Sequence, residues 1–213
     1  DIETALNCNV DLVHVFIATS DIHLEHKLKM NRDEVIDAAV KNVAVVKNSG
    51  VQVEFSAEDA CRSDPEYLIK IFQAVSDAGA DRIDIADTVG IMNPTTMFDL
   101  VSKVKDKIKI PISMHCHNDF GLATANSLAG MTAGAERIHV VINGLGERAG
   151  NAALEEVVMA AHNLYQRETT INTKLINETS ELITRLTGIS PQPNKACLLS
   201  TSPSPRDATL SRM

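Results

Sequence analysis

The feature that most constrains the fold is an alternation of short apolar runs and helical patterns, repeated five times at intervals of about 30 residues. The apolar runs have strand length: Leu12 to Ala18, Val51 to Ser56, Arg82 to Ala86, Ile110 to His115 and Arg137 to Ile142. Parallel strands need a crossover between them, usually a helix, whereas antiparallel strands can be joined by a tight turn. The alternation therefore predicts an α/β fold with a parallel sheet, either a (β/α) barrel or a doubly wound sheet.

The segments between these runs carry helix start and stop signals. Asn31 and Glu34 have the spacing of a capping box, in which each side chain bonds the backbone N–H of the other residue, and Gly50 ends the same helix. Apolar side chains repeat between them at helical spacing. Two further helices are expected to begin at a capping residue followed by proline, at Asp64-Pro65 and Asn93-Pro94. Apolar side chains at helical spacing predict two more helices, over 121–132 and 151–165.

Composition narrows the class of partner. The formal net charge is -8 and aromatic residues make up 3% of the chain, whereas nucleic-acid binding needs a basic surface and commonly uses stacking rings. No apolar run approaches the roughly 18 residues of a membrane-spanning helix. The four cysteines form no Cys-x-x-Cys pair, which argues against a disulfide framework and a thiolate zinc site. We therefore expect a cytoplasmic protein that binds small molecules, with no nucleic-acid or membrane partner.

Polar residues gather where each predicted strand ends, and the segment Ile112 to Asp119 is the most informative. His115 and His117 are two residues apart, so on a strand both side chains leave the same face and reach one point. Two converging imidazoles suit a divalent metal. The alternative to a metal site is a pair of polar residues that caps the strand end. Cys116, between the two histidines, is expected to point to the opposite face of the strand and to pack there.

The segment from Asn143 to Asn151 is a glycine turn between a strand and a helix. Its Gly144, Gly146 and Ala149 match the Gly-x-Gly-x-x-Ala pattern of dinucleotide-binding domains. That pattern follows the first strand of such a domain, whereas here it follows the fifth, and no acidic strand end comes about 20 residues later. A dinucleotide-binding domain is therefore disfavoured, and glycines that only let a loop turn remain the alternative.

Other polar residues at or near strand ends are weaker candidates when taken alone. Glu58, next to Asp59, has the chemistry of an acid or a base, but carboxylates also commonly precede helices. His14 and Thr88 would ordinarily be assigned hydrogen-bonded roles in the core. By themselves these residues do not indicate a reaction.

Five segments together resemble the family of 2-isopropylmalate, citramalate and homocitrate synthases in their order and spacing. They are 16–23 (FIATSDIH), 55–59 (FSAED), 86–90 (ADTVG), 115–119 (HCHND) and 143–151 (NGLGERAGN). The resemblance implies a (β/α)8 TIM barrel, of which this chain supplies a partial barrel, units four to eight. It also implies an acyltransferase that condenses acetyl-CoA, as co-substrate, with a 2-oxo acid at a divalent metal, Mg²⁺, Mn²⁺ or Zn²⁺.

The resemblance carries residue roles onto matching positions of this sequence. A metal chelated by the oxo acid would polarise its carbonyl for attack by the acetyl-CoA enolate, which agrees with polar residues at the strand ends. The implied roles are metal ligation by His115, His117 and Asn151, with Asn151 at the metal or immediately beside it, substrate binding by His14, Ser56 and Thr88, and catalysis by Glu58.

The resemblance also implies a division of the chain. Residues 1–168 would be the C-terminal portion of the TIM-barrel catalytic domain, and 169–195 the start of a helical linker subdomain. The remainder, 196–213, does not resemble the family, and its Ser/Pro content predicts a disordered or artefactual tail. The family's Arg-Asp-Gly strand, which supplies an acidic metal ligand and an arginine, has no counterpart. Because Asp1 stands where an initiator Met would, we expect the true start to lie upstream.

Within the family, the residues around Asn151 and the segment Leu154 to Met159 favour 2-isopropylmalate synthase, which uses 2-oxoisovalerate in leucine biosynthesis. Citramalate synthase is the next alternative, followed by homocitrate synthase. The full-length protein is expected to be a homodimer. A third possibility, from another class, is a fragment that catalyses nothing, and the chain by itself is expected to be inactive in either case.

Overall fold

The computed structural model describes residues 2–198. Contacts within the chain divide it into two compact units, Asp1–His139 and Val140–Met213. The predicted boundary between barrel and linker subdomain at residue 168 stays a prediction. Most of the predicted tail, 196–213, lies outside the described residues.

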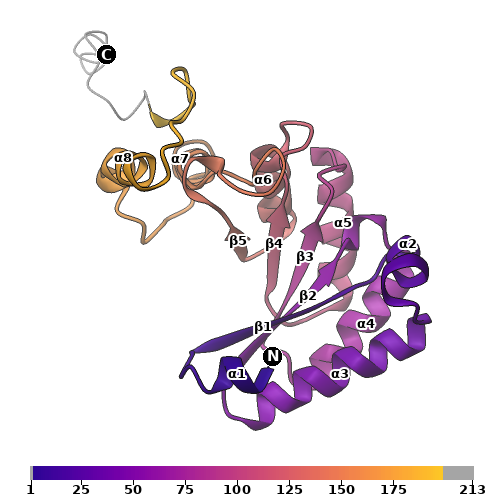
Figure 1. Cartoon of the computed structure of the whole chain (residues 1–213). Helices are drawn as coiled ribbons and strands as arrows, with labels where there is room; N and C mark the ends of the chain where they lie inside the picture. Colours follow the sequence, from indigo (N-terminus) through magenta and orange to yellow (C-terminus); the bar gives the residue numbers. More distant parts are fainter. Residues whose placement is uncertain (1, 199–213) are drawn as a thin grey trace. The chain divides into compact units, whose positions relative to one another are not determined.

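The first unit is built on a five-stranded parallel sheet with strand order β1-β2-β3-β4-β5 (Figure 1). The parallel sheet predicted from the alternation is confirmed. Because each strand pairs with its neighbours in sequence, the described sheet has no reversal of strand order, and the doubly wound alternative is wrong. The strands are β1 Leu12–Ala18, β2 Gln52–Glu58, β3 Arg82–Asp87, β4 Ile112–Cys116 and β5 Arg137–His139.

Four of the five strands differ from the predicted ranges by one to three residues at an end, and two of these differences have a local reason. β4 begins at Ile112 instead of Ile110, after Pro111, which has no N–H to donate to a sheet. β5 ends at His139 instead of Ile142, because a 3₁₀ turn begins at Ile142 and the backbone of Asn143 turns into the left-handed region at φ 61°.

The helices of the first unit begin where the capping residues predicted. Asn31 Oδ1 accepts hydrogen bonds from the backbone N–H groups of Asp33 and Glu34, and the Glu34 carboxylate accepts one from the Asn31 N–H, so the capping box is formed. Asp64 and Asn93 cap the two helices that begin with proline. The helical elements are α1 Ile2–Leu6, α2 Asp21–His23, the π-helical turn η1 Leu24–Leu28, α3 Arg32–Asn48, the 3₁₀ turn η2 Ala60–Arg62, α4 Pro65–Asp77, α5 Pro94–Lys107 and α6 Ala123–Ala133.

The two faces of this sheet have different chemistry. One face carries apolar side chains against the helices, as where Phe55 of β2 meets the ring of Phe72 of α4 at 6.3 Å between centroids. Met114 of β4 lies against Gly130 of α6 on the same face. Because successive side chains of a strand alternate between faces, the neighbours of Phe55 and Met114 point the other way. That second face carries the polar candidate residues.

Asp81, a partly exposed residue just before β3, links the start of β3 to the start of β2. Asp81 Oδ2 accepts a hydrogen bond from the Val53 N–H at 2.8 Å, and Asp81 Oδ1 accepts one from Lys47 Nζ at 2.6 Å. Burial alone would raise the pKa of Asp81, but these hydrogen bonds outweigh it and lower the pKa below its ordinary value. The ionised carboxylate therefore stabilises the folded state.

We expect Asp81→Ala to lower the free energy of unfolding at pH 7 by about 1–3 kcal/mol, because it leaves the Val53 N–H without its acceptor. The folded pKa lies below the unfolded value, so this contribution is present above the unfolded pKa of about 4 and is lost as the pH falls through the folded pKa. Urea unfolding of wild type and variant at pH 7 and at acidic pH measures both effects. Asp99→Ala, on the exposed side of α5, is the control, and a loss equal to this control would contradict the assignment.

The second unit holds two longer helices, α7 Leu154–Tyr165 and α8 Ile176–Thr187, with the 3₁₀ turns η3 Ile142–Gly144 and η4 Thr173–Leu175. The predicted helix start at Asn151 is three residues early, because the Asn151 N–H bonds the Gly144 carbonyl and closes the glycine turn. Gly150, at φ 90°, has the left-handed conformation that this closure requires. Among the described residues, the longest apolar helices are too short or too polar to cross a membrane.

Candidate functional site

The candidate site lies on the sheet face opposite the helices, at the carboxyl ends of β1 to β5. In parallel α/β folds this edge is where ligands bind. Six of the seven predicted site residues belong to the first unit; Glu58, Thr88, His115 and His117 lie at or just past the ends of their strands, Ser56 lies within β2, and His14 lies in the first half of β1.

The two histidines of β4 converge as their spacing predicted. His115 Nε2 and His117 Nε2 lie 3.2 Å apart, close to the ~3.4 Å that separates two nitrogens bound to one tetrahedral metal at about 2.1 Å. Burial, followed by the neighbouring histidines His117, His139 and His14, lowers the pKa of His115 to about 4. Its imidazole is therefore neutral at pH 7, which is the form that binds metals. The geometry of the pair and the neutral His115 imidazole fit a divalent metal.

Glu58, at the end of β2, is contacted by two basic side chains from the turn after β1. Lys27 Nζ donates to both Glu58 carboxylate oxygens at 2.5 and 2.8 Å, and His23 Nδ1 lies 3.6 Å from Glu58 Oε1. Lys27 sits in the π-helical turn η1, which turns a basic side chain back toward the strand ends. Sequence reasoning missed Lys27, because nothing in the pattern around it predicted this turn.

Thr88 is linked to Glu58 through Asp59, the residue that follows Glu58 in the chain. The backbone N–H of Asp59 donates to Thr88 Oγ1 at 2.9 Å. The Asp59 side chain is fully buried, accepts hydrogen bonds from Ser20 Oγ and Arg62 Nε, and has a left-handed backbone at φ 61°. These contacts of Asp59 fix the loop that follows Glu58 and carries the N–H group bound by Thr88.

Two buried acids and one half-buried histidine, none of which sequence reasoning selected, form a cluster on the same face, which we term the Glu54–Asp84–His139 cluster. His139 Nε2 lies 3.1 Å from Glu54 Oε1, and His139 Nδ1 lies 3.8 Å from Asp84 Oδ1. Each residue offers one potential metal-ligand atom, and these atoms lie within 4.8 Å of one another. The sequence did carry a signal for these residues: each is a polar residue between two apolar neighbours on a strand, and the strand's period of two turns it to the face opposite the helices.

The residues of this cluster shift one another's pKa values against the effect of burial. Burial alone would raise the pKa of Glu54, but the contact with His139 helps to lower it. Burial alone would lower the pKa of His139, but Glu54 and Asp84 outweigh it and raise the pKa. Burial raises the pKa of Asp84. The two acids thus favour the protonated form of His139 more than its burial alone would.

Ser56 and His14 both touch this cluster. Ser56 Oγ donates to Asp84 Oδ2 at 2.5 Å, so the hydroxyl is oriented by a buried carboxylate. The His14 ring lies 5.8 Å from the His139 ring between centroids. The predicted substrate-binding residues on β1 and β2 therefore share contacts with residues of β3 and β5.

Asn151, the remaining predicted metal ligand, belongs to the second unit. It is 8% exposed, and its side-chain oxygen lies so close to Gly146 that a Cβ there would be 1.8 Å away. The glycine at this position is thus required for the approach of Asn151 to the turn. The role of Asn151 beside a metal stays a prediction.

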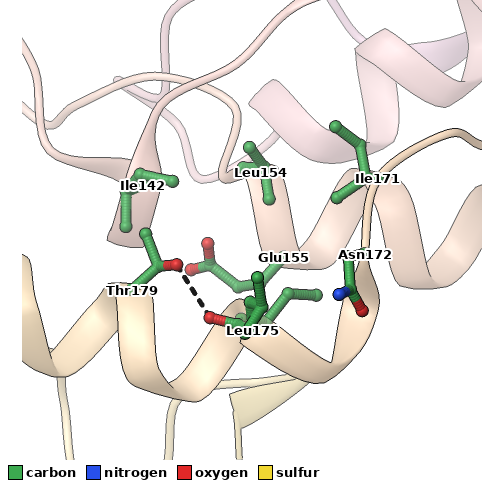
Figure 2. Close-up of a pocket in the computed structure, with 8 residues that line it drawn as sticks. Ile142, Leu154, Glu155, Ile171, Asn172, Leu175 and Thr179 are labelled. Atoms are coloured by element: carbon green, nitrogen blue, oxygen red, sulfur yellow. Dashed lines mark hydrogen bonds between the residues drawn. The ribbon is translucent and has the colours of Figure 1, made fainter.

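The second unit also contains a mostly apolar cavity of about 230 Å³ (Figure 2). Glu155 lines it although it is 1% exposed, and Glu155 Oε2 accepts a hydrogen bond from the Asn143 N–H at 3.2 Å. Ser180 Oγ of α8 donates to Asn143 Oδ1 at 2.6 Å. Glu155 and Ser180 therefore hold the start of the glycine turn that ends at Asn151, which gives this carboxylate a structural role.

Comparison with known proteins gives a consistent result. The HMGL-like family profile matches residues 1–183. The chain is 54% identical over 196 residues to the 2-isopropylmalate synthase of Methanocaldococcus jannaschii, covering 92% of this chain and 38% of that protein. It is 51% identical over 196 residues to the putative (R)-citramalate synthase CimA of Methanothermobacter thermautotrophicus, covering 92% and 39%. It is 47% identical over 196 residues to the homocitrate synthase AksA of Methanopyrus kandleri, covering 92% and 49%. The chain spans less than half the length of these relatives.

Solved structures agree on the fold. The chain is similar to the HMG-CoA lyase of Bacillus subtilis with a TM-score of 0.82 and 19% sequence identity, over 94% of this chain and 71% of that one. Identity at this level supports the fold alone. With five parallel strands in consecutive order, the chain has an α/β fold that forms part of a TIM barrel, which confirms the predicted fold class.

Proposed function

Because the chain belongs to the HMGL-like family, we propose that it is part of an acyltransferase that condenses acetyl-CoA with 2-oxoisovalerate to give 2-isopropylmalate in leucine biosynthesis. The single observation that carries the chemistry is the His115–His117 pair, with its nitrogens 3.2 Å apart and the His115 imidazole neutral. The 2-isopropylmalate synthase relatives support the choice of oxo acid. Citramalate synthase is the second candidate, favoured by the 51% identity to one relative of that name, and homocitrate synthase is the third.

In this proposal His115 and His117 would hold a divalent metal, Mg²⁺, Mn²⁺ or Zn²⁺, and Asn151 is the third predicted ligand. Such a metal would polarise the keto carbonyl of the oxo acid when bound. The donor set fits, because two neutral imidazole nitrogens at this separation can share one ion. The homodimer expected for the full-length protein belongs to the same proposal.

The chain's own polar groups would position the two substrates. His14, Ser56 and Thr88 would line the oxo-acid pocket, with the Thr88 hydroxyl directed at the substrate carboxylate. Glu58, held by Lys27, would orient the reacting groups or take part in proton transfer. The reaction then removes a proton from the acetyl methyl group, joins that carbon to the keto carbon, protonates the resulting oxygen, and releases CoA by hydrolysis of the thioester.

We expect no thiol release from acetyl-CoA and 2-oxoisovalerate by the 213-residue chain alone, because it spans 38% of the Methanocaldococcus relative. A chimera should be active if residues 1–195 replace the matching part of that relative and the rest of the relative is retained. In the chimera, Glu58→Gln should lower kcat by about 10²–10³-fold, a typical cost of losing one group that acts in the transition state. Glu136→Gln, on an exposed side chain, is the matched control.

Thiol release with 2-oxoisovalerate, pyruvate and 2-oxoglutarate tests the substrate. A chimera that prefers pyruvate would move the proposal to citramalate synthase, and one that prefers 2-oxoglutarate would move it to homocitrate synthase. A folded chimera that releases no thiol with any of the three would contradict the proposed reaction. Turnover by the 213-residue chain alone would show that the essential groups are misassigned.

A further inference from the structure

The His115 ring packs against the Glu54–Asp84–His139 cluster and not only against His117. His115 and His139 are register partners on β4 and β5, and their ring centroids lie 5.6 Å apart at an interplanar angle of 72°. The edge of one imidazole therefore faces the plane of the other. The His139 ring therefore limits the orientations open to the His115 ring.

His139 is itself held on both sides. Its Nε2 faces Glu54 at 3.1 Å and its Nδ1 faces Asp84 at 3.8 Å, so each ring nitrogen points to a different carboxylate. Glu54 is 3% exposed and Asp84 is 1% exposed. Carboxylates buried to this extent have little water to replace a lost polar partner, which makes displacement of the imidazole between them costly.

The same cluster reaches a predicted substrate-binding residue. Asp84 uses Oδ1 toward His139 and Oδ2 to accept the hydrogen bond from Ser56 Oγ. One buried aspartate thus joins the orientation of the Ser56 hydroxyl to that of the His139 ring. Through His139 the arrangement extends to His115.

We infer that Glu54, Asp84 and His139 are positioning residues that fix the His115 imidazole and the Ser56 hydroxyl in the candidate site. The inference rests on the proposed function for its purpose, since fixed imidazoles lower the cost of ordering a metal site. The residues act through His115 and Ser56, and they do not themselves touch substrate or metal. Occupation of the cluster by a metal is the competing arrangement, and the experiment separates the two.

The test uses the 213-residue chain and two isosteric variants, Glu54→Gln and Asp84→Asn, which remove charge and keep size. The first readout is the ¹H–¹⁵N imidazole spectrum of metal-free protein, in which the His115 resonances should shift in both variants. The second readout is Co²⁺ titration, where the d–d absorption of imidazole-bound Co²⁺ should appear with about 10- to 100-fold weaker affinity. Controls are Glu136→Gln and Asp99→Asn on exposed positions, which should change neither readout.

The outcomes are distinct. His115 resonances that stay at wild-type positions in a folded Glu54→Gln protein would overturn the inference, whatever the metal does. Co²⁺ binding that survives His115→Ala but is lost in Glu54→Gln would also overturn it, because the cluster would then be the metal site. Failure of the wild-type chain to bind Co²⁺ would count against the proposed metal centre, and the metal-free spectra would still decide the inference. If Asp84→Asn unfolds, as circular dichroism would show, Glu54→Gln alone decides.

Discussion

Replacing either His115 or His117 by alanine is expected to weaken Zn²⁺ or Mn²⁺ binding by more than about 100-fold. Loss of a residue that only supports a metal ligand costs up to about 100-fold in affinity, and loss of the ligand itself should cost more. The reason is geometric, since the remaining imidazole would have to bind the ion without the second nitrogen 3.2 Å away. Isothermal titration calorimetry of each variant measures the loss. The pKa of His115, near 4, means that protons do not compete for this nitrogen at neutral pH.

The control for this experiment is His26→Ala. His26 is an exposed histidine near the same end of the sheet, with a side chain that is 69% exposed. It removes an imidazole without touching the pair and should leave metal affinity unchanged. Equal affinity in wild type, His115→Ala and His117→Ala would refute the assignment of these two residues as ligands.

The second large effect is expected in the core, at Gly130 of α6. A Cβ built on Gly130 would lie 1.7 Å from the Sδ atom of Met114, whose side chain is fully buried on β4. Helix propensity by itself would favour alanine over glycine by about 1 kcal/mol. The clash should outweigh this, so Gly130→Ala is expected to destabilise the protein by about 1–3 kcal/mol and Gly130→Val by more. Chemical denaturation measures both values.

A double-mutant cycle tests the cause of that loss. Met114→Ala alone should cost about 2–5 kcal/mol because it leaves a cavity. Met114→Ala combined with Gly130→Ala should cost at least about 1 kcal/mol less than the sum of the two single changes, since the new methyl group then occupies vacated space. Additive losses would show that the two side chains do not compete for the same volume.

Local physics explains how much of the fold the sequence predicted. Capping side chains bond backbone N–H groups within three residues, so Asn31, Asp64 and Asn93 mark helix starts without any tertiary information. Five strand-length runs separated by helices require parallel pairing. The strand ends were less certain, because Pro111 and the left-handed Asn143 act on single hydrogen bonds at a boundary.

Local physics also explains which candidate residues the sequence identified. His115 and His117 converge because a strand repeats every two residues, and that period is set by covalent geometry. Glu58 and Thr88 were selected by resemblance to a family, and the structure adds the Asp59 N–H bond that links their loops. Roles for these residues as ligand, base or anchor still depend on the experiments above.

The sequence by itself determined the order of strands and helices, the face on which each side chain lies, and the meeting of two histidines within one strand. Only the tertiary structure decided that Glu54, Asp84 and His139, which are up to 85 positions apart, form one buried cluster, and that Lys27 reaches Glu58. The physical reason is that the period of a strand fixes the face to which each side chain points, but not which side chains of other strands lie next to it. Neighbours are set by hydrogen-bond register between strands, and register depends on how all five strands and their helices pack together.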